Sequence, residues 1–199
     1  MNITTLTFAG FVLATLVLFY LVPARWQNPV LLAASLFFLV TWSWTFALIA
    51  VILTAFNFTM GLLLARGGRS KRLLLWVGIG ANAAALGSLK YGDTLIQNLA
   101  LGASPDTLGT TFLTLKLLVP IGISYYVLQG ISYLIDVSRG TLEPTRRAVD
   151  FGVYMIYFAR VVSGPIERAD RFLGELKRPR RVDRHVVSEA GALITVGLF

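Results

Sequence analysis

Polar side chains along one helical face are the first residues in this chain that could do chemistry. In the apolar stretch that follows Pro120, polar residues recur at spacings of four, three and four: Tyr125, Gln129, Ser132 and Asp136. These spacings place the four side chains on one face of an α-helix. A polar face that ends in a carboxylate suits the wall of a hydrated cavity or substrate path. Hydrogen bonding between packed helices, with Asp136 at the membrane surface, explains the same spacing equally well.

A second group of polar residues lies in and after the apolar run 151–164. This run has only 14 residues, too few for a straight membrane span, so we predict a re-entrant or tilted segment buried among other helices. Arg160 within it could bind an anionic phosphate or pantetheine group, or it could pair with Asp150 or Glu167. The stretch 163–166, Ser-Gly-Pro-Ile, predicts a backbone break that must line water or be buried in protein at membrane depth. A plain turn at the membrane surface is the alternative.

Several kinds of site are excluded by residue type. The chain has no cysteine, so it offers no thiolate nucleophile and no zinc–thiolate site, and we expect no bound metal or cofactor. The one histidine, His185, lies in a basic stretch and is expected to be solvated rather than catalytic. The net charge of +8 comes from Lys and Arg confined to short connections. That distribution is typical of membrane proteins and does not indicate nucleic-acid binding.

The composition identifies an integral membrane protein. The 199 residues are 56% hydrophobic and 12% aromatic, with a mean hydropathy of +0.71, which is far more apolar than a water-soluble domain of this size. The apolar runs predict an all-α, polytopic fold. The predicted spanning helices are Ile3–Val22, two helices within Val30–Ala65 joined by a tight turn at Thr41–Trp44, Leu73–Tyr91, and Pro120–Val137.

Two basic segments set the predicted orientation in the membrane. Arg66–Arg72 and Lys177–Arg184 are rich in Lys and Arg, and short segments of this kind stay in the cytoplasm. Because three passes precede the first segment, the amino terminus is predicted to lie outside. The last residues, Ala190–Phe199, are largely apolar and reach only about half the hydrocarbon thickness. We therefore expect the chain to end inside a spanning helix, as a fragment.

Two long motifs carry a family resemblance. They are PIGISYYVLQGISYLIDVSRG at 120–140 and SGPIERADRFL at 163–173, supported by Lys90-Tyr91. The chain resembles the membrane-bound O-acyltransferase family, in particular the bacterial branch that acetylates exported polysaccharides such as alginate. The resemblance implies a ring of helices around a thin core pierced by a tunnel, in the bacterial inner membrane. It also implies that residues 1–199 form the amino-terminal part of a single membrane domain.

The resemblance further implies an activity. Family members pass an acyl group from a cytoplasmic donor, such as acetyl-CoA or an acyl-carrier thioester, to a hydroxyl of a cell-envelope or exported polysaccharide. They do so together with periplasmic or cell-envelope partner proteins. An intramembrane histidine is the expected general base, and in the family it lies downstream of the position of Phe199. We therefore assign no catalytic residue here and expect this chain alone to be inactive.

The family also suggests which residues shape the tunnel. In family members, the segments that match certain parts of this chain lie near the core. In this chain those segments contain Pro120, Gln129, Tyr133, Asp136, Gly164, Pro165 and Arg168. Tyr125, Ser132 and Arg160 join these candidates from the residue pattern. The family usually has a proline and an uncharged polar residue where this chain has Ala159-Arg160, which sets its donor recognition apart.

Three alternatives remain open at this point. The first is transfer of D-alanine from an acidic carrier protein to a cell-wall polymer, with the basic segment Lys177–Arg184 attracting the carrier. The second is a transporter or non-catalytic membrane subunit that passes a substrate along the polar helical face. A transporter would show inverted repeats or paired broken helices, and only one candidate break, at Gly164-Pro165, is present in the sequence. The third is a truncated copy with a structural role.

Overall fold

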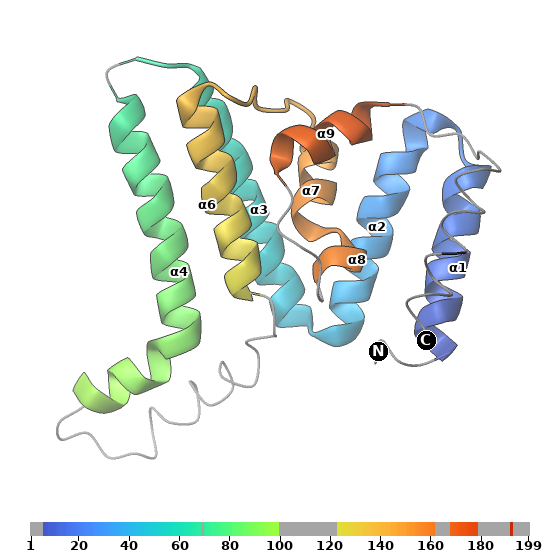
Figure 1. Ribbon diagram of the computed structural model, residues 1–199. Helices are drawn as coiled ribbons and strands as arrows, with labels where there is room; N and C mark the ends of the chain where they lie inside the picture. The colour runs from blue at the N-terminus through green and yellow to red at the C-terminus, as the bar shows by residue number, and fades with distance from the viewer. Residues whose placement is uncertain (1–5, 69, 100–122, 162–167, 179–191, 193–199) are drawn as a thin grey trace.

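The computed structural model describes residues 6–68, 70–99, 123–161, 168–178 and 192 (Figure 1). Within these ranges every regular element is helical, as the composition predicted. The helices are α1 (Leu6–Leu21), α2 (Ala24–Trp42), α3 (Trp44–Ala65), α4 (Lys71–Leu99), α6 (Ile123–Arg139), α7 (Ala148–Ile156), α8 (Phe158–Val161) and α9 (Ala169–Lys177).

Membrane-spanning character is clearest in α3 and α4. In the part of the chain that the structure describes, Trp44–Ala65 and Lys71–Lys90 are long and apolar enough to cross a membrane, and Thr7–Leu21 is a shorter apolar helix. These segments match the first, third and fourth predicted passes. Helix α2 has the length for a pass but begins at Ala24 rather than at Val30. Its first turns therefore include polar residues, among them the buried Gln27 and Asn28.

The turn between α2 and α3 is as tight as the tryptophan pattern predicted. Ser43 is the single residue between the two helices, and its backbone is extended at φ −159° and ψ 121°. Its hydroxyl oxygen accepts a hydrogen bond from the Phe46 amide at 3.3 Å. A serine at this position satisfies one of the free amide groups at the start of α3. The chain therefore reverses direction with almost no loop.

The predicted ends of α4 and α6 need correction. Helix α4 continues to Leu99, past the predicted end at Tyr91, because the residues beyond Tyr91 contain no proline to stop it. Figure 1 shows its last turns bending away from the rest of the helix. Helix α6 continues to Arg139 and α7 begins at Ala148. The connection between the helix predicted to end at Val137 and the apolar run 151–164 is therefore shorter at both ends.

Close packing of α3 on α6 depends on two glycines. A β-carbon at Gly61 of α3 would lie 2.5 Å from Cε1 of Tyr133, and one at Gly130 of α6 would lie 2.8 Å from Nδ2 of Asn57. Small residues let helix backbones approach closely, which membrane helices use because burial alone does not drive their association. The glycines thus make room for two large polar side chains at the helix interfaces.

Short helix α7 lies between the longer helices. It packs against α2, α3 and α9, and Figure 1 shows it beside α3 and α2 with α9 across its upper end. All seven residues from Asp150 to Ile156 are buried. A bend at Tyr157 then separates α7 from the four-residue helix α8. The predicted burial among other helices is confirmed for residues 151–156, and the re-entrant or tilted course of the segment stays a prediction.

Candidate functional site

Tyr154 of α7 is the point where the predicted site residues meet. Its side chain is 1% exposed. Arg160 and Asp136 lie in its neighbourhood, and its ring lies 6.3 Å from the Tyr133 ring, centroid to centroid. Gln129 donates a hydrogen bond from Nε2 to the backbone oxygen of Tyr154 at 2.7 Å. Gln129, Tyr133, Asp136 and Arg160 were candidates from the sequence, and all four lie near Tyr154. The sequence had not identified Tyr154 itself.

The break between α7 and α8 is held by side chains from two other helices. In a continuous α-helix the Phe158 amide would donate to the Tyr154 carbonyl four residues earlier. Here the Phe158 amide donates to Ser35 Oγ of α2 at 3.2 Å, and the Tyr154 carbonyl accepts from Gln129 of α6. The two backbone groups released by the break thus each have a side-chain partner, as buried backbone groups require.

Ser35 is well placed for this role. It is fully buried, and its hydroxyl donates to the Leu31 carbonyl in its own helix at 2.7 Å. This local bond orients the hydroxyl oxygen so that a lone pair faces the Phe158 amide. Sequence reasoning did not single out Ser35, because a lone serine in an apolar helix usually bonds only to the preceding turn.

Tyr133 is buried in the interface between α3, α6 and α7. Its ring lies 4.6 Å from the Phe151 ring, centroid to centroid, and its side chain touches Gly61. Its hydroxyl oxygen has no hydrogen-bond partner among the described residues. A buried hydroxyl without a partner costs free energy, so a polar group supplied from elsewhere would stabilise this position.

Arg160 packs on an aromatic ring. Its guanidinium carbon lies 4.1 Å from the centroid of the Phe172 ring of α9, a cation–π arrangement. The Asp150 carboxylate instead accepts from Asn28 Nδ2 at 2.8 Å and pairs with Arg147 at 3.5 Å. The predicted Arg160–Asp150 pair is therefore wrong. Glu167, the other predicted partner, lies outside the described residues.

The remaining predicted residues are dispersed. On α6, Ser132 and Asp136 are half-buried, whereas Tyr125 is exposed. Arg168 is exposed and immediately precedes α9, where its side chain makes no capping hydrogen bond. Gly164, Pro165 and His185 lie outside the described residues. The structure thus brings Gln129, Tyr133, Asp136 and Arg160 near Tyr154, and the assignment of Tyr125 to a substrate path stays a prediction.

A reciprocal pair of asparagines joins α3 to α4. Asn57 Nδ2 donates to Asn82 Oδ1 at 3.1 Å, and Asn82 Nδ2 donates to Asn57 Oδ1 at 2.9 Å. Each amide also donates to the carbonyl four residues earlier in its own helix, and both side chains are fully buried. The sequence held the signal for this pair, since each amide is a costly polar residue inside a predicted spanning helix.

A third polar contact joins α3 to α6. The Tyr126 hydroxyl donates to the Ala50 carbonyl at 2.6 Å and also bonds to the Thr54 hydroxyl.

Within the described ranges, no three acidic or histidine side chains gather in a way that could hold a metal ion. The chemistry available around Tyr154 is therefore that of hydrogen bonding and of two opposite charges.

Comparison with known proteins gives relatives of one kind. The chain is 35% identical over 159 residues to the protein named "Probable alginate O-acetylase AlgI" of Azotobacter vinelandii, covering 76% of this chain and 31% of that protein. It is 33% identical to the protein of the same name from Pseudomonas aeruginosa, covering 76% and 29%. A "Peptidoglycan O-acetyltransferase" of Helicobacter pylori is 26% identical, covering 80% and 35%.

These relatives confirm the resemblance seen in the motifs at 120–140 and 163–173. The chain spans about a third of the length of the curated relatives it matches. No family model matches the chain, and no solved structure matches it.

Proposed function

We propose that this chain, which is homologous to bacterial polysaccharide O-acetyltransferases of the membrane-bound O-acyltransferase type, supplies part of the membrane domain of such an enzyme. The reaction is transfer of an acetyl group to a polysaccharide hydroxyl. In it the hydroxyl oxygen attacks the carbonyl carbon of a thioester, a general base takes the hydroxyl proton, and the thiol leaves. The relationship to the alginate O-acetylases, 35% identity over 159 residues, carries this proposal.

The cluster around Tyr154 suits a supporting role in this reaction. Gln129, Asp136 and Arg160 place an amide, a carboxylate and a guanidinium around one buried tyrosine within an otherwise apolar group of helices. Polar groups at such a position are costly, and they commonly line a substrate path. We assign these three residues to the wall of that path and Arg160 to the attraction of an anionic donor. Phe172 orients the Arg160 guanidinium through ring contact.

The proposed setting is the bacterial inner membrane, crossed several times, with the amino terminus outside. The donor is acetyl-CoA or an acyl-carrier thioester from the cytoplasm, and envelope proteins take part in delivering the acetyl group to the polymer. Because the chain has no native cysteine, single-cysteine labelling tests the topology cleanly. A cysteine at the exposed Ser70 should react with a membrane-impermeant maleimide only after the cells are opened. Labelling of intact cells would reverse the proposed orientation.

The activity is tested by complementation. The intact protein is expressed in an alginate-producing bacterium that lacks its own O-acetylase, and the O-acetyl content of the exported polymer is measured. We expect acetylation to return, and to fall in Asp136→Asn and Arg160→Gln variants that reach the membrane at normal levels. Ser88→Ala, an exposed position on α4, serves as the control. An unacetylated polymer in cells that instead incorporate labelled D-alanine into wall polymers would support the alternative transferase.

A further inference from the structure

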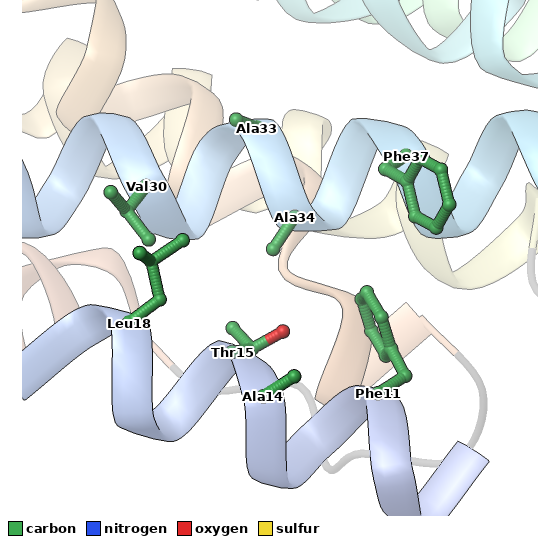
Figure 2. Close-up of a pocket in the computed structure, with 8 residues that line it drawn as sticks. All are labelled: Phe11, Ala14, Thr15, Leu18, Val30, Ala33, Ala34 and Phe37. Carbon is green, nitrogen blue, oxygen red and sulfur yellow. The ribbon is translucent and has the colours of Figure 1, made fainter. Parts of the chain in front are cut away.

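An apolar groove lies between α1 and α2 and takes no part in the cluster around Tyr154. It has a volume of about 330 Å³. Figure 2 shows side chains from the two helices facing each other across it: Phe11, Ala14, Thr15, Leu18, Val30, Ala33, Ala34 and Phe37. Apart from the Thr15 hydroxyl, every side chain in this lining is hydrocarbon.

The groove exists because small residues face each other where the two helices should pack. Ala34 of α2 points toward α1, where the small Ala14 lies, so neither helix fills the space between them (Figure 2). At one end the Phe11 ring closes the groove by stacking on Phe37, with ring centroids 6.0 Å apart. Leu18 and Phe37 of the lining are 51% and 58% exposed, so the groove opens on the outer surface of the described helices. An apolar space of this kind does not hold water, and in a membrane hydrocarbon fills it.

Beyond the Val30 end of the groove, α2 carries two residues of types that suit a lipid headgroup. Trp26 precedes Val30, Ala33 and Phe37 by four, seven and eleven residues, so it lies on the same face of α2. Its side chain is 54% exposed, and the neighbouring Arg25 is exposed as well. Tryptophan is typical of the membrane–water interface, and a basic side chain there attracts anionic lipids.

We propose that this groove binds one acyl chain of an anionic phospholipid whose headgroup lies at Arg25 and Trp26. The end of α2 that carries Arg25 is also the end at which α3 leads into the basic segment 66–72 (Figure 1). This end faces the cytoplasmic leaflet in the proposed topology, where anionic lipids are concentrated. An extended hydrocarbon chain is thin enough to enter a groove of this volume.

The intact protein is placed in nanodiscs that contain equal amounts of phosphatidylglycerol and phosphatidylcholine. The protein is then released from the nanodiscs, and native mass spectrometry measures the lipid that stays bound to it. We expect a retained lipid with a preference for phosphatidylglycerol of about fivefold, the attraction expected from one arginine near a membrane surface. Ala34→Phe should remove the retained lipid by filling the groove. Arg25→Gln should keep a bound lipid but abolish the preference, and this exposed change leaves the packing intact.

Matched variants on α4 control for general effects. Ala83→Phe adds the same ring at an exposed position of α4, and Arg72→Gln removes an exposed charge near its first turn; both should retain lipid as the unmodified protein does. Equal lipid retention by the unmodified protein and by Ala34→Phe would overturn the proposal. So would a phosphatidylglycerol preference that survives Arg25→Gln. Neither result depends on acetyl transfer. The proposed lipid site and the proposed enzyme activity are therefore tested independently of each other.

Discussion

Substitution of Ser35 and Gln129 tests the account of the break between α7 and α8. Ser35→Ala leaves the buried Phe158 amide without its acceptor, and Gln129→Leu leaves the Tyr154 carbonyl without its donor. Each single change should lower the free energy of unfolding by about 1–3 kcal/mol, the cost of a buried polar group without a partner. The effect of Gln129→Leu should be nearer the lower end, because this side chain is only partly buried.

The double variant gives the sharper result. The two groups that lose their partners, the Phe158 amide and the Tyr154 carbonyl, are those that bond to each other in an uninterrupted helix. With both side chains removed, the backbone can close this bond, so the double variant should be more stable than the sum of the singles by about 0.5–3 kcal/mol. Closing the bond turns Arg160 away from Phe172, so acetylation by the intact enzyme should stay low although stability returns.

Equilibrium unfolding of the intact protein in mixed micelles, followed by tryptophan fluorescence during an SDS titration, measures these free energies. Ser88→Ala removes a serine that bonds only within its own helix, at an exposed position of α4, and should change the free energy of unfolding by less than about 0.5 kcal/mol. If the effects of Ser35→Ala and Gln129→Leu simply add, the backbone does not close when both are removed. The explanation of the break by two replacement partners would then be wrong.

Three further substitutions test other contacts in the same way. Asn57→Leu should destabilise by about 1–3 kcal/mol because Asn82 loses its partner, and Asn82→Leu in the same protein should recover part of this; a larger loss in the double variant would contradict the reciprocal pair. Gly61→Ala should cost about 1–3 kcal/mol by overpacking against Tyr133, and an unchanged unfolding midpoint would contradict the close helix approach. Tyr133→Phe should leave the free energy of unfolding unchanged or raise it, because the hydroxyl that it removes has no partner among the described residues. Loss of acetylation in this stable variant would show that the substrate uses the hydroxyl. A lower free energy of unfolding would instead show that the hydroxyl has a hydrogen-bond partner.

Features that depend on nearby residues could be predicted from the sequence. The tryptophans around Ser43 and the basic segment 66–72 both mark helix ends, and both predictions were confirmed. The break at Tyr157 could not be predicted, since neither proline nor glycine marks it. Its partners Ser35 and Gln129 lie 123 residues from Phe158 and 25 residues from Tyr154 along the chain. The packing of three helices, rather than local backbone preference, determines where α7 ends.

The same distinction explains why the candidate site was only partly predicted. The spacing of polar residues on α6 identified Gln129 and Asp136, which do lie at the cluster, but it also included Tyr125, which is exposed. Helical periodicity gives the angle of a side chain around its own axis. It does not give the position or the orientation at which a neighbouring helix such as α7 packs. Tyr154 was missed because its contacts depend on how α7 packs against α6.

Two kinds of buried polar group can be separated in the described helices. The Asn57–Asn82 pair satisfies its own hydrogen bonds, and the Tyr126 hydroxyl is bonded to α3; such groups fix the helices relative to each other and need nothing more. Around Tyr154 the situation is different, because the nearby Tyr133 hydroxyl is buried and lacks a hydrogen-bond partner among the described residues. A buried polar group without a partner in an apolar setting can form a hydrogen bond with a polar substrate. This contrast supports our proposal that the substrate path of the acetyltransferase runs beside α6 and α7, with the α3–α4 interface as its rigid support.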